Sequence, residues 1–551
     1  MKDLFASCYK LTSLDLSYFD TSSVTDMLFM FKDCISLESL NLSNFNTKKV
    51  KNMNNIFGGC INLVSVDYSS FDTSLVTIMS GMFSNCMKLT SINVSHFNTS
   101  LVTSMNSMFC NCTSITSLEL SNFKTNNVEN MESMFNGCNN LLSLDISNFD
   151  TSFVTGMKQM FSFCYELTSL NIENFNTSKV KSMEQMFNGC KKLTSLNITH
   201  FNTSLVTDMR NMFNNCEKLT SLNLSNFNGT LVTVMQYMFD GCKELKFLDL
   251  SNFKASSAIN MQNMFSDCQS LTSLNLSNFN TSCATGMRYM FYNCKELKTL
   301  DISNYNISKV SYLEYMFSGC ENLVSLDISN FDFSKVSRID NMLSNCSSLV
   351  YLNLGSIESL DKINNKTDIL TNISNNLKYC TSDFFKEYLE ISELECNNIC
   401  FEKNIKLIVE ENLCLTSCRD NTNYQYEFNN VCYNKCPENT HISENDEFLC
   451  EIDLECKYYY NSDKSKCYDE IIEGYYLKDE ESKILLKCHD DCKTCDKKET
   501  TDNTNCNSCL NGKILNFGNC VDSCENGIEY DNNNNKICKC PENVKNVVKI
   551  V

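Results

Sequence analysis

Cysteine recurs every 26 residues through the first two-thirds of this 551-residue chain, without a single insertion. The fourteen positions are Cys8, Cys34, Cys60, Cys86, Cys112, Cys138, Cys164, Cys190, Cys216, Cys242, Cys268, Cys294, Cys320 and Cys346. A strict period of this length predicts one small unit stacked on itself, in which each copy buries its apolar side against its neighbours. We therefore expect an elongated repeat array and a separate tail, not the three or four compact domains that the length alone suggests.

The copy that starts at Cys86 shows what each unit is expected to form. Leu89, Ile92 and Val94 have L-x-x-L-x-L spacing. The last two alternate with serine and asparagine, which predicts a short strand with one buried face. After it the apolar spacing changes to three and four, which favours a short helix with Thr99 or Ser100 as its N-cap. The stripe of that helix would be Val102, Met105, Met108 and Phe109.

One strand and one helix in 26 residues predict an α/β solenoid of the leucine-rich-repeat type. We expect a right-handed array with a parallel sheet on its concave side and short helices on its convex side. Phenylalanine recurs once per copy and predicts a buried spine, in which replacement of a central ring by alanine costs about 3–5 kcal/mol. The spine consists of Phe19, Phe45, Phe71, Phe97, Phe123, Phe149, Phe175, Phe201, Phe227, Phe253, Phe279 and Phe331, interrupted by Tyr305.

The cysteine column is predicted to consist of buried free thiols. Parallel side chains in neighbouring copies rarely meet the torsion near 90° that a disulfide needs, so these cysteines should act as small hydrophobes. Cys110 and Cys283 lie outside the column.

The layout M-x-x-M-F-x-x-C-x-x-L-x-x-L-x-L-S-x-F-x-T-S-x-V resembles the BspA-like leucine-rich repeats of bacterial and protist surfaces. Residues Met105, Met108, Phe109, Cys112, Ile115, Leu118, Leu120, Phe123 and Val128 carry one copy, and similar copies cover about residues 1–357. The resemblance implies a surface protein that adheres to host matrix or to other cells. Some units of that family run 23 residues, so the ligands of that branch are not carried over.

The outward strand positions are expected to line the binding surface. Their middle column is acidic or asparagine in every copy, which we interpret as a solvated polar ladder that also offers acceptors to a basic or repetitive ligand. Aromatic residues are rare there, and protein contacts concentrate on tyrosine, tryptophan and arginine. The candidate ligand-binding residues are therefore Phe247, Asp249, Asp301, Asp327 and Tyr351.

The motif ends near Gly355, so we expect the solenoid over residues 1–357 and a cap or linker over 358–395. Residues 396–551 are predicted to form disulfide modules, because 19 cysteines fall within the 172 residues from Cys380 onward. Their paired spacing resembles furin-like, growth-factor-receptor or EGF-like cysteine-rich modules, which implies a stalk.

Four tail cysteines have spacing that also suits zinc. Cys492, Cys495, Cys506 and Cys509 form C-x-x-C-x10-C-x-x-C, which is a zinc-knuckle pattern in a reducing compartment. In an oxidising compartment the same four residues are disulfide partners, and this is the interpretation we favour. No other metal and no cofactor is expected.

Composition and motifs argue against an enzyme and against a nucleic-acid partner. The chain has only four histidines and none of the common phosphate-binding or nucleophile motifs. Its formal net charge is −20, without a basic cluster that would neutralise phosphates.

The sequence also suggests a fragment of a longer protein. Met1 falls inside a copy, and neither a signal peptide nor an apolar run of about 20 residues is found, so membrane association would need segments absent from this chain. We expect a non-catalytic, extracellular recognition or adhesion protein that binds a protein or glycan ligand. The alternative is an intracellular repeat scaffold with a zinc-binding tail.

Overall fold

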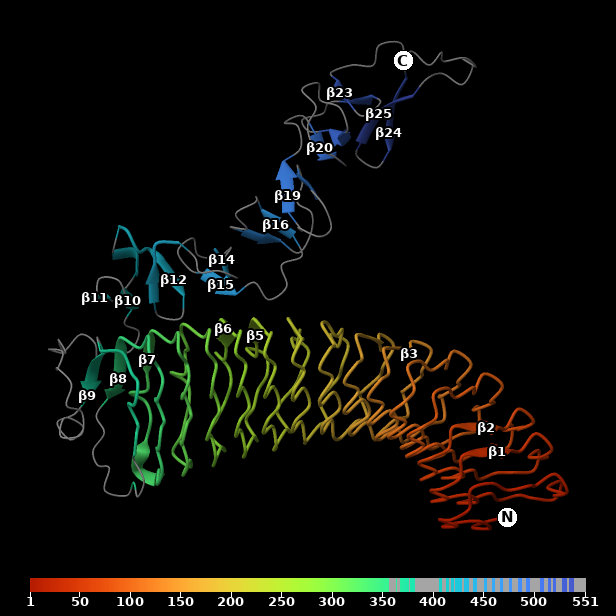
Figure 1. Ribbon diagram of the computed structural model, residues 1–551. Helices are drawn as coiled ribbons and strands as arrows, with labels where there is room; N and C mark the ends of the chain where they lie inside the picture. Colours follow the sequence, from red (N-terminus) through yellow and green to blue (C-terminus); the bar gives the residue numbers. More distant parts are fainter. Residues whose placement is uncertain are drawn as a thin grey trace. The chain divides into compact units, whose positions relative to one another are not determined.

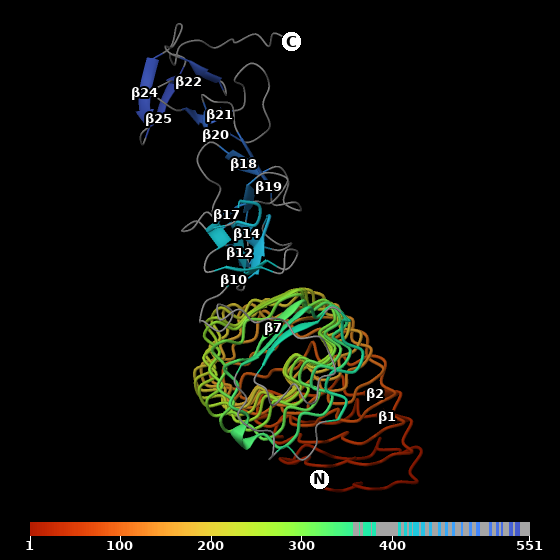
Figure 2. The same cartoon turned by 90° about the vertical axis from the view of Figure 1, so that its left-hand side faces the viewer.

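The chain forms two compact units, Met1–Glu402 and Lys403–Val551. The computed structural model describes residues 1–355 without a gap, then residues 363, 367–375 and 377–381, and short stretches between 406 and 539. In Figure 1 the first unit is a curved array of stacked coils, and the view in Figure 2 shows these coils overlying one another around a common interior. The predicted solenoid is confirmed.

Short parallel strands mark the same position in several coils, because side chains there alternate between the core and solvent. Pairs form between β1 and β2, β3 and β4, β5 and β6, and β7 and β8, with each residue opposite the one 26 positions later. The strands are β1 (Ser39–Asn41), β2 (Ser65–Asp67), β3 (Ser143–Asp145), β4 (Ser169–Asn171), β5 (Phe247–Asp249), β6 (Ser273–Asn275), β7 (Ser325–Asp327) and β8 (Tyr351–Gly355). The copy at Cys86 keeps the alternation, with Ile92 and Val94 buried between exposed polar residues, although no strand is assigned there.

The predicted short helix is wrong. The segment around Met105–Asn111 is a run of tight turns, in which Ser107 and Asn111 have φ values of 57° and 56°. Backbone N–H groups of Met105, Ser107, Phe109 and Asn111 donate to carbonyls of the next coil at 2.6–3.0 Å, while those of Met108, Cys110 and Cys112 donate to carbonyls three residues earlier. A left-handed residue every four positions prevents a helix from continuing.

This arrangement repeats through the array. Single parallel bridges connect coil to coil at the same position, from Asp26 and Asn52 to Tyr312 and Arg338. Thr99 caps no helix; it is buried and its hydroxyl bonds to Lys124 of the next coil. Within the described residues the 3₁₀ helices are η1 (Phe333–Lys335) and η3 (Cys418–Asp420).

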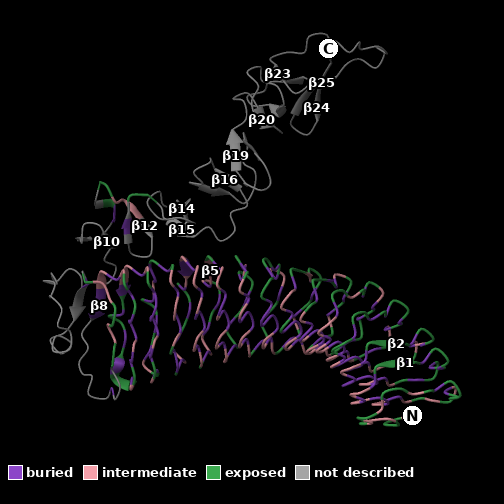
Figure 3. Cartoon of the chain, in the orientation of Figure 1, coloured by how far each residue is buried: buried purple, intermediate pink, exposed green. Residues whose placement is uncertain are grey.

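Two aromatic columns fill the core, which lies between exposed edges in Figure 3. The predicted spine is buried from Phe45 to Phe331, whereas Phe19 in the first coil is 38% exposed. The second column is the more continuous ring stack, because successive centroids lie 5.4–6.1 Å apart with planes 1–25° apart. It comprises Phe5, Phe31, Phe57, Phe83, Phe109, Phe135, Phe161, Phe187, Phe213, Phe239, Phe265, Phe291 and Phe317.

The stack continues past the last motif copy. Strand β9 (Lys378–Thr381) pairs in parallel with β8, so the sheet extends beyond residue 357. Ile363 and Leu377 are buried against the array core, and Leu370 and Ile373 pack on it partly buried. The rest of the expected cap or linker, which includes Phe384, Phe385, Tyr388 and Leu389, lies outside the described residues.

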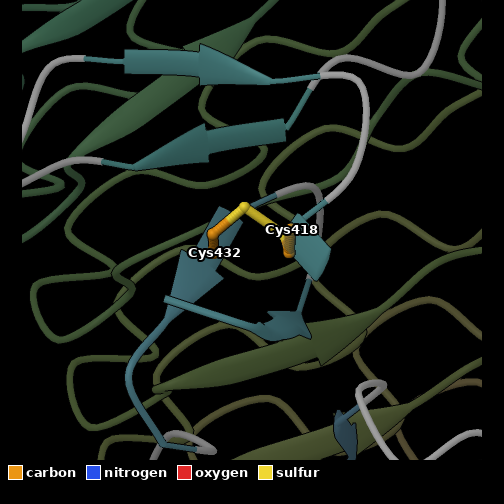
Figure 4. The surroundings of a disulfide bond; sticks show 2 residues. All are labelled: Cys418 and Cys432. Atoms are coloured by element: carbon orange, nitrogen blue, oxygen red, sulfur yellow. A yellow bond between two sulfur atoms is a disulfide. The ribbon is translucent and has the colours of Figure 1, made fainter. Parts of the chain in front are cut away.

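The second unit contains short, mostly antiparallel strands. They are β10 (Lys406–Ile408), β11 (Leu413–Leu415), β12 (Tyr426–Phe428), β13 (Val431–Tyr433), β14 (Thr440–Ile442), β15 (Cys450–Ile452), β16 (Tyr458–Tyr460), β17 (Lys466–Tyr468), β18 (Tyr475–Leu477), β19 (Ile484–Lys487), β20 (Cys492–Cys495), β21 (Cys506–Cys509), β22 (Ile514–Asn516), β23 (Asn519–Val521), β24 (Ile528–Asn532) and β25 (Asn535–Lys539). Three four-stranded sheets share one order, as in β11-β10-β13-β12. Cys418 and Cys432 form a disulfide between η3 and β13 (Figure 4).

Candidate functional site

The five residues singled out in the sequence lie on the strand face, distributed over several coils. Phe247 and Asp249 belong to β5, Asp327 to β7 and Tyr351 to β8, while Asp301 occupies the equivalent place in the coil between β6 and β7. Phe247, Asp249, Asp301 and Tyr351 are partly buried and Asp327 is exposed. Since adjacent strands lie about 4.8 Å apart, these residues span roughly 20 Å and do not form one compact site.

The acidic and amide side chains of this face have a local structural role. Seven residues after each column cysteine from Cys8 to Cys320, the side chain accepts the backbone N–H two positions later. Asp249 accepts from Ser251 at 2.7 Å, and Asp301 accepts from Ser303 at 3.0 Å. Such Asx turns end the strand segment and orient the next turn. Hydrogen bonds from the Ser69 hydroxyl and N–H lower the pKa of Asp67, so the carboxylate stays ionised.

The cysteine column contains free thiols, as predicted. From Cys34 to Cys346 the column cysteines are buried, and Cys8 is partly exposed in the first coil. Burial raises the pKa of the Cys164 and Cys216 thiols to about 12, so these side chains stay protonated and unreactive near neutral pH. Cys110 and Cys283 are partly exposed free thiols.

The four cysteines with zinc-knuckle spacing lie opposite one another along the backbone. Strands β20 and β21 are antiparallel, with Cys492 opposite Cys509 and Cys495 opposite Cys506. Their side chains lie outside the described residues. Within the part of the chain that the structure describes, no group of three or more histidine, cysteine or acidic side chains is placed to hold a metal ion. The same described residues include no helix with the length and apolar character that crossing a membrane requires.

A cluster of tyrosines lies on the turn segments of the repeat, and the sequence analysis missed it. The rings of Tyr289 and Tyr315 stack with centroids 4.7 Å apart and planes 4° apart. Tyr292 meets both rings edge-on, at 5.6 Å from Tyr289 and 6.3 Å from Tyr315. All three are partly exposed, and we call them the tyrosine cluster.

Charged side chains surround this cluster. The Arg288 guanidinium lies 5.7 Å from the Tyr289 ring centroid, and Arg338 bonds Glu314 at 3.3 Å and Asp340 at 3.2 Å. Glu314 is only 4% exposed, and its Oε2 atom has no hydrogen-bond partner among the described residues. A buried carboxylate oxygen without a donor is costly, because it has lost water and gained nothing in exchange.

Alignment of the repeats contains the signal for this cluster. Tyr289 and Tyr315 both lie five residues before a column cysteine, where most other coils have asparagine, glutamine, glycine or serine and the remaining ones have Asp3, Phe29 and Tyr237. Their φ values are 59° and 56°, which explains why small or amide residues prevail in that column. The repeat motif is defined by its apolar positions, so it does not reveal a tyrosine in this column.

A family model described as "Mycoplasma protein of unknown function, DUF285" matches the chain in five overlapping stretches, residues 1–118, 59–169, 111–196, 162–274 and 260–379. No curated protein matches the chain.

Solved structures of repeat proteins also match. A leucine-rich repeat protein from Bacteroides ovatus is 15% identical, over 64% of this chain and 86% of that one, with a TM-score of 0.30. A leucine-rich cell surface protein from Faecalibacterium prausnitzii is 19% identical, over 63% and 80%, with a TM-score of 0.29. The functional domain of InlJ from Listeria monocytogenes, which includes a cysteine ladder, is 19% identical, over 63% of this chain and 66% of that one, with a TM-score of 0.19.

Proposed function

Because the chain belongs to this DUF285 family and its first unit is a leucine-rich-repeat-like solenoid, we propose that it is a non-catalytic recognition or adhesion protein of a cell surface. The solenoid binds a protein or glycan, on host matrix or on another cell, and the cysteine-rich second unit acts as a furin-like stalk. Nucleic acid is not a partner.

One observation carries this proposal. The interior of the array is closed by columns of identical side chains, whereas its outer surface repeats polar and charged side chains from coil to coil. Extended surfaces of this kind suit large ligands, because they offer many contacts and little enclosure. Carboxylates on an open surface lack the desolvated cleft that acid–base catalysis needs.

Binding of the full chain to a panel of extracellular-matrix proteins and to a glycan array tests the proposal. We expect saturable binding to at least one member, with a dissociation constant in the micromolar range or below. Heat-unfolded chain serves as the control for adsorption. Absence of saturable binding across both panels contradicts the proposal.

The backbone pairing of β20 with β21 is also compatible with a second candidate, an intracellular repeat scaffold with a zinc-binding tail. It brings four cysteines together in a way that suits zinc or disulfides equally. Thiol counting and metal analysis separate the two. The surface protein should lack zinc and show slow native reaction at Cys8, Cys110 and Cys283, with the rest of the array cysteines reacting after denaturation. The scaffold should contain zinc and react at every cysteine once unfolded.

A further inference from the structure

The tyrosine cluster joins three features that recognition sites use. Its rings belong to two neighbouring coils, because the Tyr289 N–H donates to the Glu314 carbonyl and the Tyr315 N–H to the Asp340 carbonyl, each at 3.0 Å. Protein hot spots favour tyrosine and arginine, and here the three tyrosines are partly exposed while Arg288 and Arg338 are exposed. Beside them Glu314 keeps one oxygen without a donor.

A second glutamate in the array, Glu184, has one more cation partner than Glu314. Glu184 occupies the same place in its coil as Glu314, six residues before a column cysteine. Lys158, from the preceding coil, lies 2.6 Å from Glu184 Oε2, and Arg210, from the following coil, lies 3.8 Å from Oε1. Both oxygens of Glu184 therefore face a cation.

At Glu314 only one of these two cations is in place. Arg338 is bonded to Oε1, but Arg288, which occupies the place of Lys158, lies over the Tyr289 ring instead. At 5.7 Å it is near the outer limit for a cation–π contact, and the described residues give it no ion pair. Among the described residues Glu314 thus has an ion pair at Oε1 and none at Oε2.

We propose that the tyrosine cluster and Glu314 bind a lysine or arginine side chain of a basic protein segment. This inference rests on the proposed recognition function and names the chemistry of its partner. The incoming cation takes the position at Glu314 Oε2 that Lys158 holds at Glu184, and its alkyl stem packs on the tyrosine rings. A formal charge of −20 over the chain attracts basic partners and speeds their encounter.

The array supplies substitutions that preserve its backbone. Asn263 and Asn341 occupy the column of Tyr289 and Tyr315 with the same left-handed φ, so Tyr289→Asn and Tyr315→Asn keep a conformation that asparagine tolerates. Tyr237→Asn, at the same column position outside the cluster, is the matched ring control. Glu184→Gln is the matched control for Glu314→Gln, and thermal unfolding checks that each variant is folded.

The probe is a peptide of alternating lysine and glycine, with its fully acetylated form as the neutral comparison, titrated into the full chain by calorimetry. We expect Tyr289→Asn, Tyr315→Asn and Glu314→Gln each to weaken binding about tenfold, because each removes a cation–π contact or the acceptor. Tyr237→Asn and Glu184→Gln should stay within about twofold. Arg288→Gln should strengthen binding, since it removes a like charge from the site.

Two outcomes overturn the inference. Equal weakening in cluster and control variants means that the peptide binds only through net charge. If the parent chain does not bind the peptide, but the cluster variants lose matrix or glycan binding, the site binds a ligand other than a basic side chain. In the second case the proposed recognition function survives, whereas failure of every ligand in both experiments removes that function as well.

Discussion

Each column cysteine from Cys34 to Cys346 combines apolar volume with a weak hydrogen-bond donor. Its S–H donates to the carbonyl oxygen of a phenylalanine 29 residues earlier, at 3.1–3.3 Å. The Phe31 carbonyl, for example, accepts both the Cys60 thiol and the Cys34 N–H. The thiol thus fills the core and ties one coil to the one before it, which valine or serine would do only in part.

Tyr305 is the one tyrosine in the phenylalanine spine, and its buried hydroxyl has no hydrogen-bond partner among the residues that the structure describes. Burial raises the pKa of this phenol well above its usual value. We expect Tyr305→Phe to stabilise the protein by about 1–2 kcal/mol, because it removes a desolvated polar group and keeps the ring. Urea unfolding measures the change. Phe279→Tyr, the reverse substitution one coil earlier, should destabilise the protein. A loss of stability in Tyr305→Phe would falsify the interpretation of the Tyr305 hydroxyl as an unsatisfied buried group.

Asp240 should make stability depend on pH in the unusual direction for a carboxylate. Burial raises the pKa of Asp240 to about 6 from its ordinary 3.8, with Asp267 adding repulsion. The folded state therefore holds the proton more tightly than the unfolded chain, so this site loses stability as pH rises from about 4 to 6. Asp240→Asn should be more stable at pH 7 by about 1–2 kcal/mol, allowing for solvent screening, and equal to the parent near pH 4.

Urea titrations at pH 4, 5, 6 and 7 measure this difference. Asp145 is the control, since the Ser147 N–H lowers its pKa and its contribution to stability is lost as pH falls. A difference between Asp240→Asn and the parent that stays constant with pH rules out the titration of Asp240 as its cause.

Among the elements of the repeat, buried threonines join neighbouring coils through two hydrogen bonds each. The Thr177 hydroxyl donates to the Asn202 carbonyl at 2.9 Å and accepts the Asn202 N–H at 2.8 Å. Thr21, Thr47, Thr73, Thr99, Thr151, Thr203 and Thr281 do the same to the residue 25 positions later. This column satisfies backbone groups that the turn would otherwise bury unpaired.

Thr177→Val keeps the shape of the side chain and leaves both backbone groups of Asn202 without their partner. We expect a loss of about 2–4 kcal/mol in the free energy of unfolding. Thr155→Val is the control, because Thr155 is exposed and bonds only the Glu129 carbonyl at 3.3 Å. Its effect should stay below about 0.5 kcal/mol. Equal losses in the two variants, measured by denaturant unfolding, would show that the buried hydroxyl pair contributes nothing specific.

The strand segments and core columns could be predicted from sequence, and the turn segments could not. Burial alternates at Ile92 and Val94 as a strand requires, so their period-two spacing identified the strand segment. The spacing of Val102, Met105 and Phe109 fits two structures equally well, the apolar stripe of a helix and a series of three-residue turns. Only the left-handed residues between them distinguish the two, and asparagine, serine or glutamine at those places carries a weak signal.

The candidate site was harder to predict for a different reason. Aspartates such as Asp249 and Asp301 were predicted to bind a ligand because acidic residues recur in their column. The column recurs because its side chains form the hydrogen bonds of a turn. The tyrosine cluster depends on Tyr289, Tyr292 and Tyr315 meeting across two coils, and that contact appears only when copies are aligned in space. An exception within a column is the better guide to recognition in a repeat protein than the column itself.

In the molecule as a whole, the array holds together through contacts between adjacent coils. Backbone N–H groups on the turns donate to the next coil, thiols to the previous one, and the phenylalanine rings stack from neighbour to neighbour. Energies in such a stack add up along one dimension, so damage to one coil is felt mainly by the coils beside it.

Phe161→Ala tests this one-dimensional coupling. The Phe161 ring lies 5.8 Å from Phe135 and 5.6 Å from Phe187, and its loss leaves a cavity in the middle of the column that should cost about 3–5 kcal/mol. Hydrogen exchange followed by mass spectrometry should show protection falling over residues 131–190 and unchanged over residues 287–346, because the distant coils keep both of their neighbours. A uniform loss of protection along residues 1–355 would mean that the array unfolds as one cooperative unit, and a loss confined to the altered coil would mean that the ring stack transmits nothing.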